Sequence, residues 1–288
     1  MPYSLPERPQ RTLRMPAVVT GRGYWSGVEN RVEFRPSAVG SGVVFLRSDL
    51  GPEALVPAVV ASVVEARNRT RIERGPACVH LIEHVMSALA GLGIDNCTVV
   101  VTAEELPGMD GSAQAFVAAL DGAGAVDQEL PAAPLAVEAT VRVGSDVSWI
   151  EASPPRFSGL SIEYTLDYGP GPIGRQQLDI DITPTAYREQ LAAARTFLSI
   201  GDAARLRASG LGATVSPGDL VLFGPDGPVG TALRWPDECV RHKVLDAVGD
   251  LALAGRPLHA HIRAFRSGHA LNATLVGELL ARAGDQLA

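Results

Sequence analysis

One segment restricts the fold of this chain more than any other, and it reads Arg-His-Lys-Val-Leu-Asp-Ala-Val-Gly-Asp over residues 241–250. In a helix, which turns by about 100° per residue, His242, Asp246 and Asp250 form one stripe with Lys243 beside it, and apolar side chains lie opposite. Asp lowers helix propensity because its side chain competes for backbone hydrogen bonds. The spacing of His242 and Asp246 is typical of two metal ligands on one helix face.

A metal centre needs a further ligand, so the fold must bring a distant segment to this helix. The chain has six histidines. Besides His242, they are His80, His84, His259, His261 and His269. His84 follows Glu83 in a segment predicted to be helical from 79 to 92, and a carboxylate beside a metal-activated water can act as a general base.

An alternative reading of the same segment is an inverted zincin. His80, Glu83 and His84 match the pattern H-x-x-E-H, in which both histidines bind zinc and the glutamate is the base. A zinc peptidase that uses these three residues is therefore a second hypothesis, in which the stripe on 241–250 has no role.

His269 stands in a Ser-Gly turn between a predicted strand and the last predicted helix. Such a position lets rigid elements present a side chain to a cleft. Pairing with a carboxylate such as Asp250 would raise the pKa of His269 and keep the ring protonated, as a general acid requires.

The order of predicted elements indicates an α+β fold. In each half of the chain, strands come first and helices follow, and 288 residues with 46% hydrophobic side chains suffice for two domains. We predict similar domains at 10–122 and 134–288, joined by a Gly-, Ala- and Pro-rich linker over 122–134. The predicted strands are 31–34, 43–46, 97–101, 135–143, 147–152, 159–168, 176–182 and 258–265. The predicted helices are 79–92, 113–120, 185–209 with a break at 199–201, 237–254 and 272–287.

Composition excludes several classes of protein. The net charge of -7 argues against sequence-independent binding of nucleic acid. Three widely spaced cysteines, Cys78, Cys97 and Cys239, favour core positions in a reducing compartment. Because no apolar run approaches the roughly 18 residues of a membrane span, we expect a cytoplasmic protein, and peripheral contact with a membrane stays open.

Five motifs, in this order along the chain, closely resemble the UDP-3-O-acyl-N-acetylglucosamine deacetylases of lipid A synthesis. They are Glu83-His84 with the following helix to Asn96, then residues 109–113, 194–197, 241–250 and 267–272. The resemblance begins near Gln10 and covers nearly the whole chain. It implies two similar α+β domains with the helices inside, an active site between them, a UDP-sugar lipid precursor as substrate and a monomeric enzyme.

The resemblance also implies roles for individual residues. His84, His242 and Asp246 would hold a catalytic zinc, and Fe(II) fits the same ligands. Glu83 would be the general base, and His269, with Asp250 as its carboxylate partner, would be the general acid or the cation that stabilises the oxyanion. Thr196 would donate a hydrogen bond to that oxyanion. The residues that would contact the substrate are Lys243, Tyr168, Phe197 and Arg266.

The chain departs from the family pattern at several positions. Trp25 stands where the family usually has a histidine, His80 has no counterpart among the catalytic residues, and Leu81 replaces a customary threonine. The acyl-passage insert, about 197–223, lacks the expected Gly-Gly-Ser, so the sequence does not define the acyl-chain specificity. A non-catalytic homologue that binds a nucleotide-sugar or a lipid is a third hypothesis.

Overall fold

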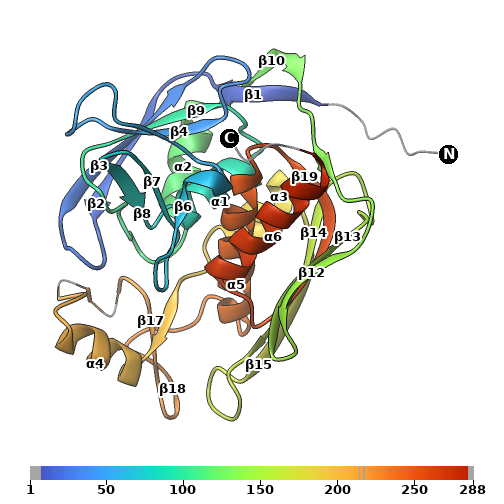
Figure 1. Ribbon diagram of the computed structural model, residues 1–288. Coiled ribbons are helices and arrows are strands. Elements are labelled where there is room, and N and C mark those ends of the chain that lie inside the picture. The colour runs from blue at the N-terminus through green and yellow to red at the C-terminus, as the bar shows by residue number, and fades with distance from the viewer. Residues whose placement is uncertain (1–7, 214, 217, 285–288) are drawn as a thin grey trace.

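The computed structural model describes residues 8–213, 215–216 and 218–284. It confirms the α+β fold class, because sheets lie on the outside of the molecule and the longer helices pack between them (Figure 1). Apolar side chains from both halves form one continuous buried core.

The first half is built on a five-stranded sheet with the order β2-β3-β9-β4-β5. Its strands are β2 (Ala17–Arg22), β3 (Glu29–Pro36), β4 (Val43–Arg47), β5 (Leu55–Pro57) and β9 (Cys97–Val101). In β3 the alternation of residues buries Val32 and Phe34, and leaves Arg31 exposed on the other face. The pair β4 and β9 is parallel, and the other neighbours in this sheet are antiparallel.

The second half repeats this topology in a sheet with the order β12-β13-β19-β14-β15. Its strands are β12 (Val141–Ser145), β13 (Ser148–Ser153), β14 (Leu160–Asp167), β15 (Arg175–Ile182) and β19 (Leu258–Phe265), with the short β11 (Leu135–Ala136) paired to β19. The last strand again inserts between the second and third, parallel to the third. This shared order supports 10–122 and 134–288 as the domain limits that we propose.

Two helices accompany the last strand of each sheet. Before and after β9 come α1 (Glu83–Gly91) and α2 (Gln114–Ala123), and before and after β19 come α5 (Glu238–Leu251) and α6 (His269–Arg282). Figure 1 shows α1, α5 and α6 between the two sheets. The apolar side of α5 is buried, and its polar stripe is buried as well, so α5 is a core helix with a polar site along it.

The remaining elements are short. They are β1 (Pro9–Leu13), η1 (Val60–Ser62), β6 (Val63–Val64), β7 (Arg71–Arg74), β8 (Ala77–His80), β10 (Ala125–Pro131), α3 (Pro184–Ala186), η2 (Tyr187–Leu191), β16 (Phe197–Ser199), α4 (Ile200–Ala208), β17 (Val221–Gly224), β18 (Gly227–Val229) and η3 (Ala252–Ala254). The elements β16, α4, β17 and β18 form a projection at the lower left of Figure 1, which contains the predicted insert 197–223.

The structure corrects the predicted helix 79–92. Residues Ala77–His80 form β8, which pairs with β7, and Leu81 adopts a left-handed φ of 63° that ends the strand. The helix starts only at Glu83. His80 therefore does not share a helix face with His84, contrary to the expectation from helical periodicity.

Several other predicted elements are divided or displaced. The predicted linker contains β10, which pairs with β1, so this Gly- and Ala-rich segment is a strand. The predicted strand 135–143 splits into β11 and β12, and the predicted helix 185–209 splits into α3, η2, β16 and α4. The last helix spans His269–Arg282 instead of the predicted 272–287, and residues 285–287 of that prediction lie outside the described residues.

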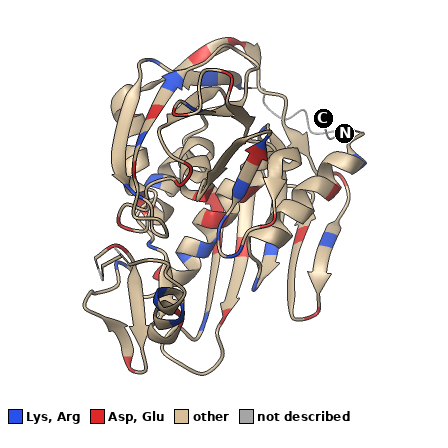
Figure 2. Ribbon diagram, turned by 60° about the vertical axis from the view of Figure 1, so that its left-hand side comes forward, with Lys and Arg blue, Asp and Glu red and all other residues tan. Residues whose placement is uncertain are grey.

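The surface carries both signs of charge. Figure 2 shows acidic and basic residues interspersed over the strands and loops of both halves. Within the described part of the chain, no helix is long and apolar enough to cross a membrane. Cys78, Cys97 and Cys239 are buried and free, which confirms their prediction as core residues.

The helices α1 and α5 approach each other closely at Gly249. A Cβ atom added there would lie 2.1 Å from the carbonyl oxygen of Glu83, which is far inside van der Waals contact. Beside this contact, the Ser87 hydroxyl donates a hydrogen bond of 2.7 Å to the carbonyl of Leu245. The absence of a side chain at Gly249 thus sets the distance between the two helices.

We expect Gly249→Ala to lower the free energy of unfolding by roughly 3 kcal/mol, because two backbones must separate to admit the methyl group. Denaturant unfolding of the purified variant measures the change. Gly277→Ala in α6 is the matched control, since nothing lies within 4 Å of its added Cβ, and it should stabilise the protein by about 0.5–1 kcal/mol. Equal effects of the two substitutions would contradict the close-packing argument.

Candidate active site

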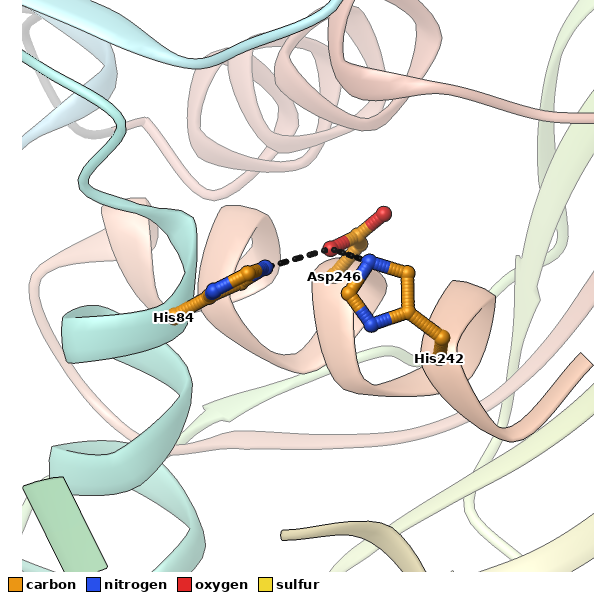
Figure 3. A group of neighbouring side chains, drawn as sticks. All are labelled: His84, His242 and Asp246. Carbon is orange, nitrogen blue, oxygen red and sulfur yellow. Dashed lines mark ion pairs between the residues drawn. The ribbon is translucent and has the colours of Figure 1, made fainter. Parts of the chain in front are cut away.

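Three buried side chains converge between α1 and α5. His84 comes from the first turn of α1, and His242 and Asp246 lie one turn apart on α5 (Figure 3). Asp246 Oδ1 lies 3.6 Å from His84 Nε2 and 3.3 Å from His242 Nε2. One ligand atom of each residue lies within 4.8 Å of the other two, and within the described ranges this is the one such group of three.

The protonation of this group suits a cation. The Nδ1 atom of His242 lies 3.0 Å from the carbonyl of Ala194, and a hydrogen bond donated there leaves Nε2 with its lone pair toward the cluster. Burial lowers the pKa of His242 to about 4, so the ring is neutral near pH 7. Asp246 Oδ1 is buried and accepts no hydrogen bond from the described residues. A buried carboxylate oxygen that faces two imidazole nitrogens is the donor set of a divalent metal ion.

Lys243 lies beside the cluster. Its Nζ atom donates a 2.8 Å hydrogen bond to Asp246 Oδ2, the carboxylate oxygen that does not face the histidines. Although burial opposes ionisation of Asp246, its electrostatic interactions with the neighbouring His242 and Lys243 side chains hold the pKa of that carboxyl well below its usual range. Asp246 is therefore ionised, and Lys243 fixes its orientation.

Glu83 immediately precedes His84 and is buried at the start of α1. Its Oε2 atom accepts a 3.0 Å hydrogen bond from the backbone N–H of Thr70. Burial raises the pKa of Glu83 above its ordinary value, which strengthens the carboxylate as a base.

His269, which is half-buried, and the buried Asp250 form a second pair. His269 Nδ1 donates to Asp250 Oδ2 over 2.9 Å, and Asn272 Nδ2 donates to the same oxygen over 2.8 Å. Burial alone would disfavour the imidazolium, but the charge of Asp250 and this hydrogen bond outweigh it and raise the pKa of His269 to about 9. The ring is thus a cation at neutral pH, held in place by a buried carboxylate.

Thr70, which no sequence pattern pointed to, joins these groups. Its backbone N–H binds Glu83, its hydroxyl donates to Asp250 Oδ1, and the same hydroxyl lies 3.2 Å from His269 Nδ1. Thr70 belongs to no motif, and 180 residues separate it from Asp250. The fold positions it through the hydrogen bond from the Leu81 N–H to the Thr70 carbonyl.

Two of the residues predicted to contact the substrate, Phe197 and Tyr168, extend away from His242. The ring of Phe197 lies 6.4 Å from that of His242, and Tyr168, which is 57% exposed, lies 5.6 Å from Phe197. Thr196 precedes Phe197 and donates its backbone N–H to the Gly111 carbonyl. Arg266 follows β19 with an exposed side chain and a φ of 51°.

His80 lies outside the metal-ligand group. On β8, its Nε2 atom faces Glu104 Oε1 at 3.5 Å, and it is not among the residues whose ligand atoms converge with His84. The inverted-zincin hypothesis required His80 and His84 on one helix face, and the strand conformation of β8 removes that geometry.

Comparison with known proteins shows the family of this chain. The family model of UDP-3-O-acyl N-acetylglycosamine deacetylases matches residues 10–281. The chain belongs to this family. A UDP-3-O-acyl-N-acetylglucosamine deacetylase of Myxococcus xanthus (strain DK1622) is 36% identical over 277 residues, which are 94% of this chain and 86% of the relative. The resemblance inferred from five motifs is confirmed, and the deacetylase is a hydrolase of an N-acetyl amide from a metal-dependent family.

The pair of His269 and Asp250 in the deacetylase makes a prediction about pH. We expect NMR titration to find a pKa of about 9 for His269, and Asp250→Asn to lower it because the counter-charge is lost. Since the folded pKa lies above the unfolded value of about 6.5, the pair stabilises the fold fully below that pH. This contribution disappears as the pH rises through about 9. A wild-type His269 that titrates near 6.5 would contradict the pairing.

Proposed function

We propose that the protein is a zinc-dependent UDP-3-O-acyl-N-acetylglucosamine deacetylase that acts in lipid A biosynthesis. The observation that carries the proposal is the convergence of His84, His242 and Asp246 in a chain of this family, with Glu83 beside them. Hydrolysis of the N-acetyl amide would give acetate and UDP-3-O-acyl-glucosamine with a free amine.

His84, His242 and Asp246 would hold the metal. When bound, the ion supplies a Lewis acid that activates water and polarises the amide carbonyl. Two nitrogen donors and one carboxylate are a common ligand set of catalytic zinc, and Fe(II) accepts the same donors. Lys243, by pairing with Asp246 Oδ2, would keep the other carboxylate oxygen directed at the ion.

Glu83 would accept the proton of the attacking water. Its burial raises the pKa of the carboxyl toward the range in which proton transfer at neutral pH is efficient, and the Thr70 N–H holds one of its oxygens. The other carboxylate oxygen has no hydrogen bond from the described residues and remains available for the water.

His269 would supply a proton to the leaving amine. Because Asp250 raises its pKa to about 9, the imidazolium is populated at neutral pH, and its charge also stabilises the oxyanion of the tetrahedral intermediate. Thr196 would add a hydrogen bond to that oxyanion. Asp250 itself is too buried to contact substrate and acts through the imidazole.

The surroundings suit an amphiphilic nucleotide-sugar. Phe197 and Tyr168 extend an apolar surface from His242 toward solvent, and the insert 197–223 would form the acyl passage. Lys243 and Arg266 would contact the sugar-nucleotide. We further propose that the enzyme works as a monomer in the cytoplasm and contacts the membrane only peripherally.

Measuring the metal content of variants distinguishes a proposed metal ligand, Asp246, from the proposed base, Glu83. We expect Asp246→Ala to lose both the metal and turnover, because it removes the anionic ligand. Glu83→Gln should keep the metal while kcat falls roughly 100-fold to 10,000-fold, since the base is lost. Metal analysis and acetate release on the same preparations measure both quantities.

His80→Ala is the matched control for these variants. It removes a buried histidine only four residues from His84, yet His80 lies outside the metal-ligand group, so metal content should stay near that of the wild type. Loss of metal in His80→Ala, or its retention in a variant that lacks both His84 and Asp246, would overturn the assignment.

Substitution of Thr70 tests whether its hydrogen bond to Asp250 contributes to catalysis. We expect Thr70→Val to reduce kcat roughly 10-fold to 100-fold, because a hydrogen bond to a buried charged group is lost. Thr70→Ser keeps the hydroxyl and should retain most of the activity. Steady-state kinetics compares the two, and equal losses in both variants would show that the hydroxyl has no part in catalysis.

A further inference from the structure

Arg69 interacts with two residues at which the chain departs from the family pattern, Trp25 and His80. The guanidinium of Arg69 stands over the indole of Trp25, with its Cζ atom 5.9 Å from the ring centroid. The charge of Arg69 also acts on His80, whose pKa is lowered first by burial and then by this cation. Arg69 and Trp25 thus lie together although they come from separate segments of the first half.

This cluster borders the catalytic centre. Arg69 precedes Thr70, which binds Glu83 through its N–H and Asp250 through its hydroxyl. Trp25 borders the insert, since its carbonyl accepts a hydrogen bond from the N–H of Gly212. Arg69 is therefore adjacent in the chain to a residue that contacts Glu83 and Asp250, and Trp25 contacts the insert.

Buried donors of this cluster have no acceptor. Arg69 Nε and Trp25 Nε1 are shielded from solvent and make no hydrogen bond to the residues that the structure describes. Two such donors side by side are unfavourable unless water or a ligand satisfies them. The pair thus has the character of a preformed binding site for a group that accepts hydrogen bonds.

The neighbouring carboxylates do not satisfy Arg69. Glu105 accepts hydrogen bonds from the backbone N–H groups of Trp25 and Ser26, over 2.7 and 2.8 Å, and from the Ser26 hydroxyl. Glu104 faces His80 at 3.5 Å. No ion pair joins Arg69 to any acid in the described ranges, whereas Lys243 is paired with Asp246. Arg69, next to Thr70 in the chain, is thus a cation that no acid of the described residues neutralises.

We propose that Arg69 and Trp25 form the subsite that binds the diphosphate of the nucleotide-sugar substrate. A guanidinium binds phosphate oxygens with two parallel hydrogen bonds, and stacking on an aromatic ring holds its plane in place. The indole N–H of Trp25 adds a third donor. The inference rests on the proposed function, because that function supplies a substrate with a diphosphate.

The test is calorimetric binding of UDP to the wild type and to Arg69→Ala, each with and without metal. We expect the Kd for UDP to rise at least 10-fold in Arg69→Ala in both states, and KM for the acylated substrate to rise similarly with a smaller change in kcat. Metal content should stay at the wild-type level. Trp25→Phe keeps a stacking ring but lacks the N–H, and it should show a smaller loss of UDP affinity.

Arg74→Ala is the control for charge. It removes an equal charge from the exposed end of β7 and should leave UDP binding unchanged. Arg69→Lys keeps the charge but loses the forked guanidinium donors, so this variant should also bind UDP more weakly than the wild type. If Arg69→Ala does not fold, Arg69→Lys takes its place in the test. The thermal melting curve of each variant verifies folding.

The outcomes separate this subsite from the proposed function. If the wild type binds UDP and releases acetate, but the Arg69 variants bind UDP within 2-fold of it, the subsite is refuted and the function stands. Failure of the wild type to bind UDP also refutes the subsite. If the metal-loaded wild type binds UDP through Arg69 but releases no acetate from the acylated substrate, the proposed function fails and the subsite stands.

Discussion

The packing of α1 against α5 is the contact on which the site depends. Gly249 lets the backbone of α5 approach the carbonyl of Glu83, and the Ser87 hydroxyl links the helices through the carbonyl of Leu245. Because the helices are this close, His84 on α1 reaches the pair on α5. The two helices belong to the two halves of the chain, so the proposed metal-ligand group forms only when the halves are packed together.

Burial shifts the pKa values of the acidic and basic groups along this contact in opposite directions. It raises the pKa of Glu83 and lowers the pKa of His242, which favours a basic carboxylate and a neutral ligand. His269 resists the same effect only because Asp250 supplies a buried counter-charge. The buried surroundings therefore shift the pKa values of the proposed base, Glu83, and the proposed acid, His269, by different means, since each group has a different charged neighbour.

Local periodicity predicted some elements well and others poorly. The strands 97–101 and 258–265 and the helix around His242 agree with the structure, because each has a strong apolar pattern of its own. The start of α1 was predicted too early, since pairing of β8 with β7 holds residues up to His80 in a strand. The predicted linker was wrong for the same kind of reason, because β10 is stabilised by its pairing with β1, a distant segment.

The sequence alone determined the pairs that a helix places on one face, such as His242 with Asp246, and the family motifs in which Glu83, His84 and His269 occur. These features are local, and a helix converts spacing directly into proximity. Only the tertiary structure brought His84 to α5, placed Thr70 between Glu83 and Asp250, and set Arg69 against Trp25. Such contacts join segments far apart in the chain, and they leave no periodic pattern because packing, not spacing, creates them.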